Sequence, residues 1–457
     1  MTTLFAERAL LPQGWANQVR LAIDRTGRLN SVETDSSPQA GDENLGESVL
    51  LPAPCNLHSH AFQRAMAGMT EYRSAEQDDF WSWRNLMYRF LDVLAPDEIE
   101  AIAAMVYVEM QEAGYAAVGE FHYVHHQPGG APYDNVAELS DRIYAAAGAT
   151  GIGLTHLPVL YSYGGAGEQA LHGGQLRFGC DLDRFASLHE AASTGLNSLP
   201  GDCRIGVAPH SMRATVPEQL RQLKDRFGTG PIHIHVAEQV REVSEIESWL
   251  GARPVTWLLD NLDIDAGWCF IHATQMNKSE TEGLARSGAV AGLCPITEAN
   301  LGDGIFNGRT FTQSEGIFGV GSDSNVRISL SEELRQLEYS QRLHHKARNV
   351  LATGDQSTGE TLYRQIVFGG ARALNRDSGS IEAGQLADLV AIDADHASLC
   401  GLRTDQLLDG WIFAAGDTVV TDLWSAGRHC VHNGRHRQRD AVEQRFREVL
   451  SQLVDRI

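Results

Sequence analysis

Lysine is nearly absent from this chain of 457 residues, which carries only Lys224, Lys278 and Lys346. Acidic residues number 59 against 37 lysines and arginines, so the formal net charge is −22. Such a surface repels phosphate backbones and anionic lipids, which argues against nucleic acid and membranes as partners. An anionic small molecule is also repelled at long range, so binding one would require local arginine side chains.

The sequence also lacks a disulfide framework, a signal-peptide core and a long apolar run. Its seven cysteines are scattered, odd in number and contain no Cys-x-x-Cys pair, which argues against disulfides and against a thiolate metal site. No apolar run approaches the roughly 20 residues that span a bilayer. Hydrophobic residues make up 43% of the chain and charged residues 21%, as in soluble globular proteins. We therefore expect a cytoplasmic protein.

Eight short β-like runs alternate with amphipathic segments in the middle of the chain. The runs are "SVLLPAPCNLHSH", "AAVGEFHYV", "GIGLTHLPVLYS", "CRIGVAPHSM", "PIHIHVAEQ", "WCFIHATQ", "AVAGLCPIT" and "GIFGVGSDS". This alternation predicts an α/β fold with a (β/α)8 barrel. Residues 17–32, 379–393 and 417–436 also read as turns and strands, so both ends of the chain are β-like.

Polar side chains fall where these runs end. They are His58 and His60, His122 and Tyr123, Tyr161, His210, His235 and Glu238, His272, and Asp323. The active site of a (β/α)8 barrel lies at the carboxyl ends of its strands. The sequence therefore predicts that most of these side chains converge on one site.

A His-x-His pair is the first indication of a metal. His58 and His60 would share one face of a strand, because successive side chains alternate. In "HIHVAEQ", His235 lies nearer the strand end than His233, which we expect to be buried or hydrogen-bonded inside the barrel. His58, His60 and His235 together with Asp323 provide three nitrogens and one oxygen. This set suits one divalent metal, for which we expect Zn²⁺, with a position left open for water.

Three carboxylate and imidazole groups are candidates for catalysis. Asp323 could take a proton from a metal-activated water as well as bind the metal. His272 could orient that water, and Glu238 could carry protons to a substrate nitrogen. Each of them alone also fits a structural role, such as a helix cap for Asp323. Their joint position at strand ends favours the catalytic interpretation.

The pattern of His-x-His on the first strand, His on the fifth and sixth, and Asp on the eighth resembles the amidohydrolase superfamily. The His235-to-Glu238 spacing is similar to its deaminase branch. The resemblance implies a catalytic barrel over residues 53–370 and a smaller β-sandwich built from residues 1–52 and 371–457. Many members hold two metals through a carboxylated lysine on the fourth strand. "CRIGVAPHSM" has no lysine, so we expect one metal.

A closer resemblance is to the formimidoylglutamate deiminase family of histidine degradation. It rests on "NLHSHAFQRAMAGMTE", "FWSWRNLMYRF", "GEFHYVHH", "APHSMRA" and "CPITEANLGDG". The family implies hydrolysis of N-formimino-L-glutamate to N-formyl-L-glutamate and ammonia, commonly by a homodimer. It also implies substrate contacts from Gln63, Arg84, Tyr123, His210 and Arg213. Two arginines suit a dicarboxylate substrate, since a guanidinium binds a carboxylate through two parallel hydrogen bonds.

Three other functions fit parts of the pattern. A guanine or S-adenosylhomocysteine type deaminase would need a pocket for a ring instead of two carboxylate-binding arginines. An imidazolonepropionase would hydrolyse a cyclic amide. A non-catalytic barrel that serves in assembly would usually have lost metal ligands, and none is missing here.

Overall fold

The eight predicted β-like runs supply the strands of a parallel barrel in the computed structural model, which describes residues 2–72, 80–227 and 230–457. The first run is divided, because its residues 48–52 belong to the sheet of the smaller domain. The strands are β6 (Cys55–Ser59), β7 (Ala117–His122), β8 (Gly153–Leu160), β9 (Arg204–Ile205) with β10 (Ala208–Pro209), β11 (Ile232–Val236), β12 (Trp268–His272), β13 (Val290–Leu293) and β14 (Ile317–Val320). Parallel pairing of Val207 with Ile232 joins the two halves, and pairing of Ser59 with Asp323 closes the barrel. The predicted α/β barrel is confirmed.

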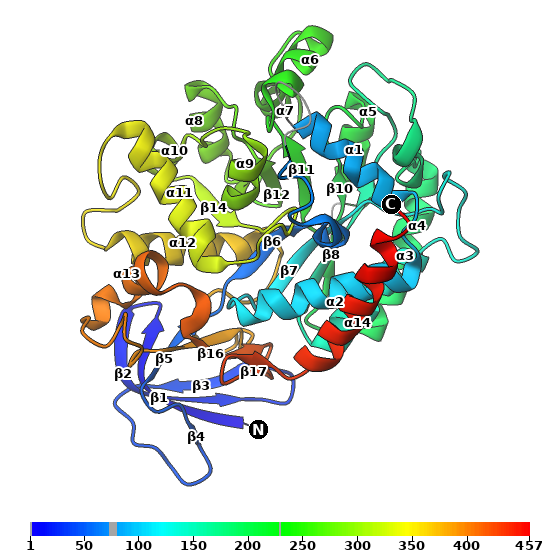
Figure 1. Cartoon of the computed structure of the whole chain (residues 1–457). Helices are drawn as coiled ribbons and strands as arrows, with labels where there is room; N and C mark the ends of the chain where they lie inside the picture. Colours follow the sequence, from blue (N-terminus) through cyan, green and yellow to red (C-terminus); the bar gives the residue numbers. More distant parts are fainter. Residues whose placement is uncertain (1, 73–79, 228–229) are drawn as a thin grey trace.

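Helices surround the barrel (Figure 1). They are α1 (Phe80–Leu91), α2 (Pro96–Glu112), α3 (Glu138–Thr150), α4 (Leu182–Gly195), α5 (Pro217–Phe227), α6 (Val240–Leu250), α7 (Pro254–Asn261), α8 (Lys278–Ser287), α9 (Pro295–Leu301), α10 (Gly308–Gln313), α11 (Leu330–His345) and α12 (Thr358–Ala373). Their ends follow from local sequence. In α8, for example, Asn277 caps the first turn by accepting a hydrogen bond from the backbone of Glu280, and Gly288 ends the helix in a left-handed conformation.

The smaller domain is a nine-stranded sheet on one side of the barrel (Figure 1). Its strands are β1 (Thr2–Leu11), β2 (Gly14–Ile23), β3 (Leu29–Glu33), β4 (Glu43–Asn44), β5 (Ser48–Pro52), β15 (Leu389–Asp393), β16 (Val420–Ser425), β17 (Arg428–His432) and β18 (Arg435–His436). Their order is β18-β17-β16-β15-β5-β1-β2-β3, with β4 paired to β1. Both ends of the chain therefore build one smaller domain, in which hydrogen bonds join all nine strands.

Alternating side chains on β5 join the two domains. Val49 and Leu51 belong to the large barrel-side core, whereas Leu50 belongs to the core of the small domain. This is the alternation expected of a strand buried on both faces. Buried Arg376 adds an ionic link, with 2.6 Å to Asp388 and 3.1 Å to Asp202.

The end of the chain is helical and contacts the barrel. Helix α14 (Arg439–Val454) packs along α2, as Figure 1 shows. Short helical segments complete the structure: η1 (Ala61–Met66), η2 (Gly173–Arg177), η3 (Leu196–Ser198), η4 (Thr404–Gln406), α13 (Leu407–Gly410), η5 (Trp411–Ala415) and η6 (Asp417–Val419). The domain boundaries given above stay predictions. Across the described residues, every helix is too short or too polar to cross a bilayer.

Candidate metal centre and catalytic pocket

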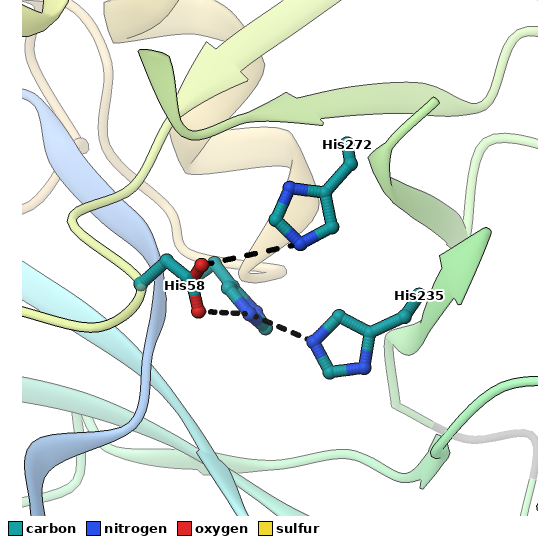
Figure 2. A group of neighbouring side chains, drawn as sticks. His58, His235 and His272 are labelled. Atoms are coloured by element: carbon teal, nitrogen blue, oxygen red, sulfur yellow. Dashed lines mark hydrogen bonds and ion pairs between the residues drawn. The ribbon is translucent and has the colours of Figure 1, made fainter. Parts of the chain in front are cut away.

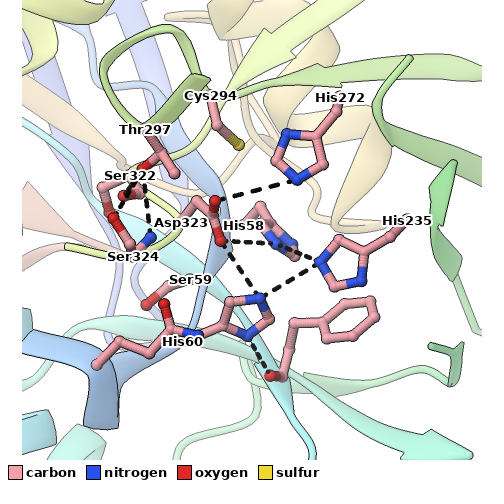
Figure 3. A network of polar contacts seen from close by, with 12 residues as sticks. His58, Ser59, His60, His235, His272, Cys294, Thr297, Ser322, Asp323 and Ser324 are labelled. Atoms are coloured by element: carbon pink, nitrogen blue, oxygen red, sulfur yellow. Dashed lines mark hydrogen bonds and ion pairs between the residues drawn. The ribbon is translucent and has the colours of Figure 1, made fainter. Parts of the chain in front are cut away.

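Three imidazoles, those of His58, His60 and His235, meet at the carboxyl ends of the barrel strands (Figure 3), and Figure 2 shows two of them beside His272. The Nε2 atom of His235 lies 3.1 Å from Nε2 of His58 and 3.3 Å from Nε2 of His60. The Nδ1 atoms of His60 and His235 donate to the backbone carbonyls of Phe121 and His210, at 2.9 and 3.0 Å. Their Nε2 lone pairs must then face one another, an arrangement that needs a cation between them.

Asp323 completes this cluster, as Figure 3 shows. Its Oδ1 lies 3.4 Å from Nε2 of His58 and 3.3 Å from Nε2 of His60. Metal–nitrogen bonds of about 2.0–2.1 Å in a tetrahedral zinc site would separate ligand atoms by about 3.3–3.4 Å. Burial lowers the pKa of His60 to about 3, so this imidazole is a neutral ligand at physiological pH. The donor set and its spacing therefore fit a divalent metal.

The backbone of Asp323 is held directly against the His-x-His strand. Its N–H donates to the carbonyl of His58 at 3.0 Å, and the N–H of His60 donates to its carbonyl at 2.9 Å. Asp323 adopts a left-handed conformation with φ 46°, which is uncommon for residues other than glycine. Gly321, two residues earlier, permits its segment to approach His58, because a Cβ atom at position 321 would lie 2.7 Å from the backbone N and O of His58.

His272 is surrounded by carboxylates. Its Nε2 lies 3.8 Å from Oε1 of Glu238 and 4.0 Å from Oδ2 of Asp323, while its Nδ1 lies 3.3 Å from Oε1 of Glu298. Burial by itself would lower the pKa of His272, but the negative charges, led by Glu238, raise it to about 10. His272 is thus placed to hold a proton beside both Asp323 and Glu238.

Glu238 is a buried carboxyl group with a proton affinity suited to neutral pH. Burial raises its pKa to about 7. The side chain of Glu242 fixes the turn that carries it, since Oε2 of Glu242 accepts a hydrogen bond of 3.1 Å from the Glu238 backbone. Beside it, burial raises the pKa of Asp303 to about 9. A general acid is most effective when its pKa lies near the working pH.

A pocket opens next to the metal cluster. Its lining includes all five predicted substrate contacts: Gln63, Arg84, Tyr123, His210 and Arg213. Gln63 donates to the hydroxyl of Tyr123 at 2.7 Å, and Arg84 donates to the hydroxyl of Tyr161 at 2.9 Å. Two guanidinium groups thus line the same pocket as His60, His235, His272 and Asp323, so an anionic group and a reacting centre can be held together.

Several pocket residues had no assigned role in the sequence analysis. Trp83, Met87, Phe178 and Leu301 supply apolar lining, and Tyr161 binds Arg84. Glu298, which lies beside His272, and Asp303, which lies beside Glu238 and His272, both belong to "CPITEANLGDG". The unusual composition of that stretch was the available signal.

Other histidines lie outside this site. His122 faces His125 and His156, with ring centroids 5.6 and 5.3 Å apart. His233 contacts the carbonyl of Ala373 at 2.8 Å, as expected for a histidine buried within the barrel. His344 is exposed on α11. The structure therefore separates the site histidines from the structural ones.

Comparisons with known proteins agree with this architecture. Residues 49–430 match the amidohydrolase family, and residues 1–46 match the family described as "Formimidoylglutamate deiminase HutF, N-terminal domain". The chain is 47% identical to formimidoylglutamate deiminase of Pseudomonas aeruginosa over 100% of both chains.

Solved structures show the same fold. An amidohydrolase from Brucella melitensis superposes with a TM-score of 0.94 and 48% identity, covering 99% of this chain and 100% of that one. An adenosine deaminase from Xanthomonas campestris with bound zinc has a TM-score of 0.82 at 19% identity, covering 99% and 98%. The chain belongs to the amidohydrolase family.

Proposed function

We propose that this protein hydrolyses N-formimino-L-glutamate to N-formyl-L-glutamate and ammonia in histidine degradation. The observation that carries the proposal is the 47% identity to a formimidoylglutamate deiminase over the whole of both chains. The N-terminal match at residues 1–46 to the same kind of enzyme supports it. The protein is accordingly a hydrolase that acts on a non-peptide C–N bond.

Enzymes of this family bind a divalent metal, and we propose one Zn²⁺ held by His58, His60, His235 and Asp323. When bound, the metal lowers the pKa of a water molecule toward neutrality and so supplies the nucleophile of the hydrolysis. The support is the convergence of three Nε2 atoms at 3.1–3.3 Å, each on a buried imidazole.

The arginines would bind and orient the substrate. N-formimino-L-glutamate has two carboxylates, and Arg84 and Arg213 line the pocket near His210. Both guanidinium groups are largely buried, which strengthens a charge-assisted hydrogen bond relative to one in water. Gln63 and Tyr123, which are hydrogen-bonded to each other, would position the remaining polar atoms.

The three catalytic candidates divide the proton transfers. Asp323 takes a proton from the attacking water, and His272 orients that water by a hydrogen bond. Glu238 passes a proton to the imine nitrogen, which departs as ammonia while the formyl oxygen comes from the water. The support is their mutual placement, with His272 3.8 Å from Glu238 and 4.0 Å from Asp323.

The proposal is tested by measuring ammonia release from N-formimino-L-glutamate by zinc-loaded protein. Guanine, adenosine and imidazolonepropionate are assayed in parallel as alternative substrates. We expect turnover of the first alone, with N-formyl-L-glutamate as the product. Activity on a purine alone would overturn the substrate assignment and the role of the arginines. Sedimentation of the same protein tests the homodimer that we also propose, and we expect the enzyme in the cytoplasm.

A further inference from the structure

The small domain carries a second group of side chains of the types that bind metals. Figure 1 shows that its strands β4, β16 and β17 lie far from the carboxyl ends of the barrel strands. Oδ1 of Asp422 on β16 lies 2.9 Å from Nε2 of His429 and 2.9 Å from Nδ1 of His432, both on β17. The other ring nitrogen of His429 lies 3.5 Å from Oε1 of Glu43 on β4. Glu43, His429 and His432 each offer a ligand atom, and these atoms lie within 4.8 Å of one another.

The cluster has more negative charge than its neighbours balance. Among the described residues, neither Glu43 nor Asp422 forms an ion pair with a lysine or arginine; both are paired only with histidine. The cluster thus brings together two carboxylates without a lysine or arginine partner in the described part of the chain, and a divalent cation would balance them.

The surroundings of His429 are partly preformed. Its ring stacks on buried Trp424 with 4.4 Å between ring centroids, so its orientation is restricted. The side chain of His432 is 68% exposed, so a metal ion could reach the cluster from solvent. Hydrogen bonds alone would account for the two histidines on Asp422. Those hydrogen bonds use Nε2 of His429 and Nδ1 of His432. The lone pair on Nδ1 of His429 therefore faces the Glu43 carboxylate at 3.5 Å, and a cation between them would satisfy both groups.

We propose that Glu43, His429 and His432 form a second divalent-metal site, distinct from the catalytic one, with Asp422 orienting both imidazoles. Two imidazoles and one carboxylate, with water completing the coordination shell, are a donor set typical of Zn²⁺ and of neighbouring transition metals. The bound ion connects β4, which lies in the segment between β3 and β5, to β17. Its role is therefore to fasten that segment to the sheet. It takes no part in catalysis, so the proposal is independent of the substrate assignment.

Zinc stoichiometry of the full chain tests the site. Protein is stripped of metal by a chelator and titrated with Zn²⁺ by calorimetry. The zinc that remains bound after gel filtration is then counted by elemental analysis. We expect two equivalents per chain for the wild type and one for the H429A/H432A variant, with ammonia release unchanged. The H344A/H345A variant removes two histidines from the surface of α11 and is the matched control, which should retain two equivalents.

Two further variants keep the test decisive. H58A/H60A should lose the catalytic equivalent and retain the second one. Glu43→Gln should weaken the second equivalent at least tenfold while both imidazoles remain. One equivalent in the wild type, or two in H429A/H432A, would overturn the proposal, as would equal losses in H429A/H432A and H344A/H345A. A lack of activity on N-formimino-L-glutamate would not change the number of zinc equivalents bound per chain, so the two proposals can fail separately.

Discussion

Replacing Gly321 with alanine tests how closely the eighth barrel strand must approach the first. A Cβ atom at position 321 would lie 2.7 Å from the backbone N and O of His58 and 2.8 Å from its Cβ. Those atoms cannot rotate away as the end of a long side chain could. The substitution must therefore displace the backbone of His58 or of the loop that carries Asp323.

The expected cost follows from these contacts. Ordinary contacts of a Cβ atom begin at 3.4 Å, so at least one backbone segment must move by several tenths of an ångström. Overpacking of this kind costs about 1–3 kcal/mol. For a chain of this length, unfolding entropies of about 2.1 cal/mol/K per residue make that a decrease in Tm of only about 1–3 °C. Metal affinity is the more sensitive quantity, because His58 and Asp323 both move, and we expect a loss of at least about tenfold, or about 1.4 kcal/mol.

Competition with a chromogenic chelator measures the zinc affinity of the Gly321→Ala variant. Gly354→Ala is the matched control, because a Cβ atom there would have no neighbour within 4 Å. We expect wild-type affinity for the control and weaker binding for Gly321→Ala, with kcat/KM reduced in parallel at limiting zinc. Equal affinities for the two variants would refute the argument that the approach of these two strands sets the ligand geometry.

Three further changes have expected outcomes. Glu238→Gln should lower kcat by about 10²–10⁴ with zinc content unchanged, because Glu238 acts on the substrate nitrogen; full activity would remove it from the mechanism. Arg213→Met should lower kcat/KM about 10–150-fold, mainly through KM, since a hydrogen bond to a charged group is worth about 1.5–3 kcal/mol; an unchanged KM would exclude carboxylate binding there. Burial would raise the pKa of Asp202, but Arg428 and Arg376 hold it below 3.8. The stability contributed by Asp202 is therefore present above pH 3.8 and lost as the pH falls through the lower folded value. The difference in urea midpoint between wild type and Asp202→Asn should shrink on acidification below about pH 4, and a constant difference would contradict the ionic role.

The sequence alone determined the elements and most of the polar positions that matter. Strand periodicity placed His58 and His60 on one face, and the ends of successive β-like runs marked the residues that a barrel brings to one rim. These are local signals, since side-chain alternation and strand termination depend on neighbours within a few residues. His235 was preferred over His233 for the same reason, because it lies nearer the strand end, and the structure places it beside His58.

Only the tertiary structure decided which polar groups meet. His122 ends a strand as His272 does, yet it faces His156 outside the barrel interior. Glu298 reaches His272 from a helix that starts after a different strand, and Glu43 reaches His429 across 386 positions of sequence. Such contacts depend on barrel closure and on how the sheet of the small domain brings distant strands together. They leave no periodic trace in the sequence, because each partner is set by packing between elements and not by the residues adjacent to it.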